Sequence, residues 1–139
     1  MFNEHKKQKS ILGIDRGSRY VGLAYSKIGH EVIFPIGYLL NDQMIFFNIA
    51  DLLIRYKVAT IVMGYPSKQK DVQEKIQKFI TNLKFILPSD DIKIELMDED
   101  YTSVQSGEIV SNFKKNVAED TISAMLILQR RKENPNSSI

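Results

Sequence analysis

The chain has 139 residues, a formal net charge of +2 and no cysteine, which suits one soluble globular domain. The lack of cysteine excludes disulfide bonds, thiolate metal sites and cysteine nucleophiles. The first residues are rich in lysine and lack the apolar stretch of a secretory signal, and no run is long enough to span a membrane. We therefore expect a cytoplasmic protein with a basic extension over residues 1–9, one domain over residues 10–132 and a flexible tail over residues 133–139.

Three short stretches of strand-forming residues open the domain, at residues 10–14, 20–26 and 32–40. Short loops separate them, which predicts an antiparallel meander. Pro35 interrupts the third stretch and predicts an edge strand or a bulge. Gly17 and Gly22 flank the first turn, where a hairpin is expected to need glycine at positive φ. A backbone without side chains would also let a phosphate approach the neighbouring Asp15.

Helices and strands are predicted to alternate through the next part of the chain. Apolar residues recur at helical spacing over residues 45–56 and 72–87, and short strand-like runs follow each of these at residues 59–63 and 92–97. Asn41 is expected to cap the first of these helices, and Pro88 is expected to end the second.

Two capping-box patterns predict two more helices, over residues 102–112 and from Asn116 to about Lys132. The complete order is β-β-β-α-β-α-β-α-α. Because parallel strands need helical crossovers, this order predicts an α/β fold with a mixed five-stranded sheet flanked by helices. It is the element order of the RNase H-like fold.

Three acidic residues stand where this architecture would bring them together. Asp15 ends the first strand, Glu99 ends the last strand, and Asp120 lies in the first turn of the final helix. Asp120 shares a helix face with Ala124 and Leu128, so it is expected to point towards the sheet. Converging carboxylates repel one another unless protons or a hard cation neutralise them, and oxygen ligands suit Mg²⁺ or Mn²⁺. Two such ions would favour phosphodiester hydrolysis.

Each acid also has a simpler explanation. Asp15 could begin a turn, Glu99 could belong to a solvated run of charges, and Asp120 could favour the positive end of the helix dipole. The functional hypothesis depends on the three acids falling together at the ends of their elements.

Basic residues border the proposed site on three loops. They are Arg16 and Arg19 in the first turn, Lys68 and Lys70 after residues 64–66, and Lys114 and Lys115 before the final helix. Loop lysines often serve only solubility. If these six cations gather at one end of a sheet, however, they would attract the phosphates of a nucleic acid, either structured RNA or branched DNA.

Four short motifs in order resemble the YqgF or RuvX family, the Holliday-junction-resolvase-like proteins. They are GIDRGS with GLAYS at residues 13–26, VMGYP at 62–66, DEDYTS at 98–103, and DTISA with LILQ at 120–129. The resemblance spans residues 11 to about 131. It implies an RNase H-like nuclease that processes the 5' end of pre-16S ribosomal RNA, with Asp15, Glu99 and Asp120 as catalytic acids. Two departures are Arg16, where the family usually has an aromatic residue, and Asp100, where it usually has arginine.

Several alternatives stay open at this point. One is Holliday junction cleavage, and another is a non-catalytic nucleic-acid-binding module. The Asp-x-Gly turn also occurs in sugar-kinase, Hsp70 and actin-type ATPases, but those need two such domains and this chain has room for one. The sequence leaves the oligomeric state open between monomer and homodimer.

Overall fold

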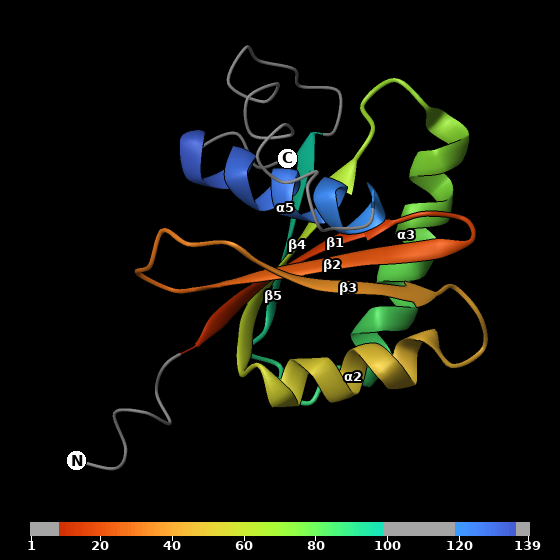
Figure 1. Ribbon diagram of the computed structural model, residues 1–139. Helices are drawn as coiled ribbons and strands as arrows, with labels where there is room; N and C mark the ends of the chain where they lie inside the picture. Colours follow the sequence, from red (N-terminus) through yellow and green to blue (C-terminus); the bar gives the residue numbers. More distant parts are fainter. Residues whose placement is uncertain (1–8, 99–118, 136–139) are drawn as a thin grey trace.

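One mixed sheet forms the centre of the structure, a computed structural model that describes residues 9–98 and 119–135. Within these residues its strands are β1 (Ser10–Arg16), β2 (Tyr20–Lys27), β3 (Phe34–Leu40), β4 (Val58–Tyr65) and β5 (Lys93–Asp98), in the spatial order β3-β2-β1-β4-β5. β1, β2 and β3 pair antiparallel, whereas β4 joins β1 and β5 joins β4 in parallel (Figure 1). The predicted meander and mixed five-stranded sheet are confirmed.

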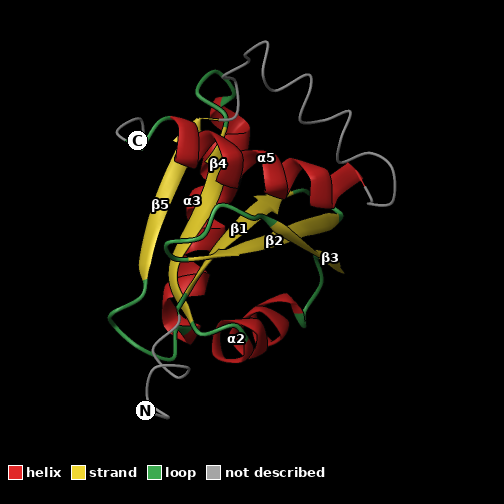
Figure 2. Cartoon of the chain, turned by 60° about the vertical axis from the view of Figure 1, so that its left-hand side comes forward, coloured by secondary structure: helices red, strands yellow, loops and turns green. Residues whose placement is uncertain are grey.

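Helices cover both faces of this sheet, as Figure 2 shows. The described helices are α2 (Ile45–Arg55), α3 (Lys70–Ile86) and α5 (Glu119–Glu133). α2 and α3 pack on one face, and α5 lies on the other. The helix predicted at residues 102–112 and the predicted start of the last helix at Asn116 lie outside the described residues. None of the described helices is long and apolar enough to cross a membrane.

The alternation of side chains along the strands builds a separate core on each face. Leu12 and Ile14 of β1 are fully buried and belong to the cluster with α2 and α3. Ala24 and Val62 belong instead to the cluster under α5, with Ala124 and other α5 residues. Residues of one strand parity therefore face α5, and this parity decides which polar side chains reach that helix.

The third strand is shorter than expected and begins at Phe34, not at Val32. Ile33 packs against the core cluster under α5, and the Glu31 carbonyl accepts a hydrogen bond from Lys132, so this stretch contacts α5 before it joins the sheet. The two expectations for Pro35 are both confirmed. β3 is an edge strand, and its register with β2 shifts between Leu23 and Ala24, opposite Pro35.

The prediction that Asn41 caps the first helix is wrong. The N-cap position is Met44, whose N–H donates to the Asp42 carboxylate at 2.9 Å. The Asn41 side chain instead donates to the Gly17 carbonyl at 2.9 Å, and the Asn41 N–H donates to the Arg19 carbonyl. Asn41 therefore fastens the end of β3 to the β1–β2 turn.

The second helix ends as predicted. Leu87 leaves the helix with ψ of 129°, the extended conformation that a following proline favours.

Candidate active site

Asp15 lies near the end of β1 on the face that α5 covers. Leu12 and Ile14 point to the other face, and Gly13 touches α5 at Leu128 and Ala124. Asp15 has the same parity as Gly13 and is partly buried. Its partner across the antiparallel pair is Gly22 of β2.

Asp120 approaches the sheet at this same point. An ideal Cβ built on Gly22 would lie 1.9 Å from the carbonyl oxygen of Asp120 and 3.2 Å from its Cβ. The first turn of α5 therefore rests directly on the backbone of β2, with the base of the Asp120 side chain over the sheet. The prediction that Asp120 faces the sheet is confirmed, and Gly22 brings it next to the strand residue that pairs with Asp15.

The two glycines at the first turn act through close contact and not through positive φ. Among the described residues, positive φ at glycine occurs at Gly29 and Gly37, so this expectation for Gly17 and Gly22 is wrong. A Cβ on Gly17 would lie 2.6 Å from the Tyr20 carbonyl, which accepts a hydrogen bond from the Gly17 N–H. Gly22 leaves space for helix backbone, so α5 and not a phosphate occupies the bare surface of β2.

A pocket of about 250 Å³ lies between Asp15 and α5. In the described part of the chain it is lined by Asp15, Ser123, Leu126, Ile127 and Arg130. The helix residues are spaced i, i+3, i+4 and i+7, so one face of α5 forms the wall. The sequence-based prediction did not include Arg130. No local sequence signal marks Arg130, because the pocket forms only where α5 crosses the sheet near Asp15.

The third predicted acid, Glu99, lies outside the described residues and directly follows Asp98, the last residue of β5. Over residues 9–98 and 119–135, no group of three or more metal-ligating side chains comes together. The described structure thus brings Asp15 and Asp120 to one place and leaves Glu99 a prediction. Lys114 and Lys115 also lie outside the described residues.

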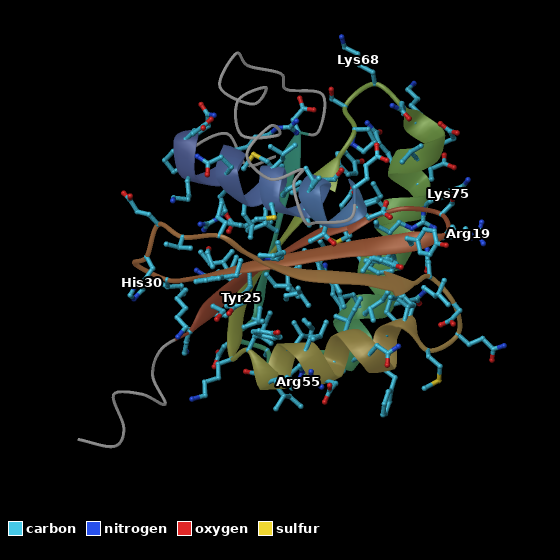
Figure 3. The ribbon with its side chains drawn as sticks, in the orientation of Figure 1. Arg19, Tyr25, His30, Arg55, Lys68 and Lys75 are labelled. Atoms are coloured by element: carbon cyan, nitrogen blue, oxygen red, sulfur yellow. The ribbon has the colours of Figure 1, made fainter. Side chains whose placement is uncertain are left out.

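The other predicted cations lie around one edge of the sheet. Because β1 and β4 run parallel, the loops that follow them leave the same edge. Figure 3 shows Arg19 at the end of the β1–β2 hairpin, Lys68 on the loop after β4 and Arg55 on α2. Arg19, Lys68 and Lys70 are exposed.

The two arginines beside the β1–β2 turn, Arg19 and Arg16, differ in their surroundings. The Arg19 guanidinium lies 5.3 Å from the centre of the Tyr20 ring, which meets Tyr38 edge-on. Arg16 is partly buried, and its Nε has no hydrogen-bond partner in the described structure. Arg16 and Arg19 thus present guanidinium groups beside the turn that follows Asp15.

Comparison with known proteins places this architecture in context. A protein from Sulfurihydrogenibium sp. named "Putative pre-16S rRNA nuclease" is 36% identical over 126 residues, which is 86% of each chain. A protein of the same name from Chlamydia caviae is 32% identical, over 90% of this chain and 83% of its own. RuvC from Thermus thermophilus, solved in complex with a Holliday junction substrate, covers 94% of this chain and 98% of its own at a TM-score of 0.66 and 9% identity. This likeness confirms the predicted RNase H-like fold.

The family assignment follows from the sequence as a whole. A family model described as "RuvX: Holliday junction resolvase" matches residues 9–131, which is nearly all of the domain predicted over residues 10–132. The chain therefore belongs to the RuvX family.

Proposed function

We propose that this protein is a metal-dependent nuclease that cleaves phosphodiester bonds in the processing of the 5' end of pre-16S ribosomal RNA. One observation carries the proposal. The backbone of Asp120 rests on Gly22, the strand partner of Asp15, so α5 brings two acidic residues from distant parts of the sequence close together on one face of the sheet. Acidic residues that serve only the stability of the fold do not have to lie close together. A metal-dependent phosphodiester hydrolase does require carboxylates that lie close enough to share metal ions.

Glu99 is proposed as the third acid of the site. It follows β5 directly in the sequence, and it has the same parity as Glu95 and Met97. Met97 packs in the cluster under α5, and Glu95 binds Arg131 of α5. Strand alternation thus supports placing Glu99 on the face where Asp15 and Asp120 meet.

Mg²⁺ or Mn²⁺ fits this donor set, because carboxylate oxygens are the ligands that these hard cations prefer. Asp15, Glu99 and Asp120 would hold them, most simply as a pair. When bound, such ions supply activation of the attacking water and stabilisation of the leaving oxygen. The carboxylates would fix the positions of such ions, and α5 forms one wall of the pocket that contains Asp15.

Nucleic acid is the proposed substrate class, and RNA is favoured over DNA by the names of the relatives. Four cations lie near the edge of the sheet where β1 and β4 end: Arg16, Arg19, Lys68 and Lys70. Lys114 and Lys115 are proposed to lie near them. Cations at this edge attract a phosphate backbone without reading its sequence. Cleavage of ribosomal precursors would place the protein in the cytoplasm.

Holliday junction cleavage is the alternative that the family description favours. A four-way junction is two-fold symmetric, so its resolution calls for a homodimer with paired sites, whereas one cut in an RNA precursor needs only a monomer. Light scattering on the purified protein, with and without each substrate, would show which assembly accompanies activity.

The decisive experiment compares two substrates side by side. A ribosomal precursor carrying the 5' boundary of mature 16S RNA and a four-way DNA junction are each incubated with the protein and Mg²⁺. Cleavage of the RNA at a defined position, abolished by EDTA, supports the proposal. Cleavage of the junction alone supports the alternative. Salt-sensitive binding of either substrate without cleavage would show a non-catalytic module.

A further inference from the structure

Arg130 extends its guanidinium from the last turns of α5 to the end of β5. Its Nη1 donates to the carbonyl of Asp98 at 3.0 Å. The Arg130 side chain also lines the pocket that contains Asp15. One cation thus links the last residue of β5 to the wall of the candidate active site.

The hydrogen-bonding capacity of Arg130 is only partly used. A guanidinium carries five N–H donors and no acceptor. Of these, the Nε–H of Arg130 is buried and meets no acceptor within the described structure. A buried donor without a partner is costly, and such groups in native proteins call for an explanation. An anionic oxygen that bound to this guanidinium would supply an acceptor for donors that the protein leaves unused.

The pocket has room for a phosphate group. Its volume of about 250 Å³ is room for several water molecules, each of which takes about 30 Å³ in the liquid. Arginine is the side chain that best matches the geometry of phosphate oxygens. Neighbouring Arg131 is already engaged, because its Nε and Nη2 both donate to Glu95, so Arg130 is the arginine of this turn that remains available.

We infer that Arg130 is a phosphate-binding residue that holds the nucleic-acid backbone beside the cleavage position. This inference rests on the proposed nuclease function and names a residue that positions its substrate. Arg130 lies ten residues after Asp120, about 15 Å along the helix axis. It therefore binds a phosphate further along the strand from the one that is cleaved, and it acts on substrate binding, not on the chemical step.

Two measurements on Arg130→Gln test this role in the full-length protein. The probe is a fluorescently labelled RNA spanning the 5' boundary of mature 16S RNA, and binding is followed by anisotropy in EDTA, where no cleavage occurs. We expect the dissociation constant to rise about 10-fold, and the slope of log K against log salt concentration to fall by about 0.7, the loss of one phosphate contact on a single strand. In Mg²⁺, KM should rise by the same factor while kcat stays close to wild type. The dissociation constant of Arg130→Lys should lie between those of the wild type and Arg130→Gln.

Arg131→Gln is the matched control, because Arg131 also joins α5 to β5 but is bound to Glu95. It removes a link of the same kind without removing a phosphate contact, so its salt slope should equal that of the wild type. Arg55→Gln, an exposed arginine on α2, controls for a general loss of positive charge.

The outcomes separate the inference from the proposed function. If the wild type binds and cleaves the RNA but Arg130→Gln matches Arg131→Gln in affinity and slope, Arg130 is only a structural link and the inference is wrong. A loss of kcat with unchanged KM would also overturn it. If the wild type neither binds nor cleaves the RNA, the proposed function fails and the inference fails with it.

Discussion

The carbonyl oxygen of Asp120 lies against Gly22, where an ideal Cβ would come within 1.9 Å of it. No residue other than glycine fits there unless the helix or the strand moves. Because Gly22 is paired with Asp15, this contact fixes how closely α5 brings its first turn to the end of β1. The spacing of two candidate metal ligands is thus set by a residue that has no side chain.

Gly22→Ala should therefore impair activity more than its effect on stability explains. The added methyl group meets backbone and not a flexible side chain, so we expect the free energy of unfolding to fall by about 1–3 kcal/mol. Displacement of Asp120 by about 1 Å should lower kcat about 100-fold. Urea denaturation and initial cleavage rates measure the two effects.

Gly29→Ala provides the control for this variant. A Cβ at Gly29 meets nothing within 4 Å, but the residue has φ of +87°, so alanine should cost about 1 kcal/mol through backbone strain alone. It should lower stability while kcat is retained. Equal losses of kcat in the two variants would contradict a positioning role for Gly22.

Asn41→Ala should loosen the hairpin that carries Arg16 and Arg19. The substitution removes the partly buried hydrogen bond from the Asn41 amide to the Gly17 carbonyl, worth about 1 kcal/mol. We expect a corresponding fall in the free energy of unfolding and a higher KM with little change in kcat. Asn82→Ala, at an exposed position of α3, is the matched control and should change stability by less than about 0.7 kcal/mol. Identical unfolding of the two variants would show that the Asn41 link is dispensable.

The ion pair between Glu95 and Arg131 should help to hold α5 against β5. The two side chains are 26% and 29% exposed, and two N–H groups of Arg131 converge on one carboxylate oxygen at 3.1 and 2.9 Å. A double-mutant cycle with Glu95→Gln and Arg131→Gln should give a coupling energy of about 1 kcal/mol in urea denaturation, reduced at high salt. Purely additive effects would mean that solvent screens the pair completely.

The strands and helices could be predicted from sequence because their apolar residues follow clear periods. The spacing of Ile76, Phe79, Ile80 and Leu83 predicts the buried face of α3, and the structure buries all four. Pro88 ends this helix for a local steric reason. Such features depend on neighbours in the sequence, which is why they can be read without a structure.

Features that depend on contacts between distant residues could not be predicted in this way. Asn41 has the chemistry of a helix cap, yet its amide reaches Gly17, 24 residues away. Gly22 has the sequence context of a turn glycine, but its role comes from a helix that follows it by about 100 residues. Arg130 was missed because its pocket exists only once α5 crosses the sheet.

The most direct test of the proposed site is a kinetic cycle on Asp15 and Asp120. Cleavage of the ribosomal precursor in Mg²⁺ is measured for the wild type, Asp15→Asn, Asp120→Asn and the double variant, after circular dichroism has confirmed that each is folded. If the two carboxylates hold one metal centre, each single variant should lose at least about 100-fold in kcat, and the double variant should lose little more, because residues that act as a unit are not additive. Metal-dependent cleavage at the wild-type rate in Asp15→Asn, or losses that simply multiply in the double variant, would contradict a shared site.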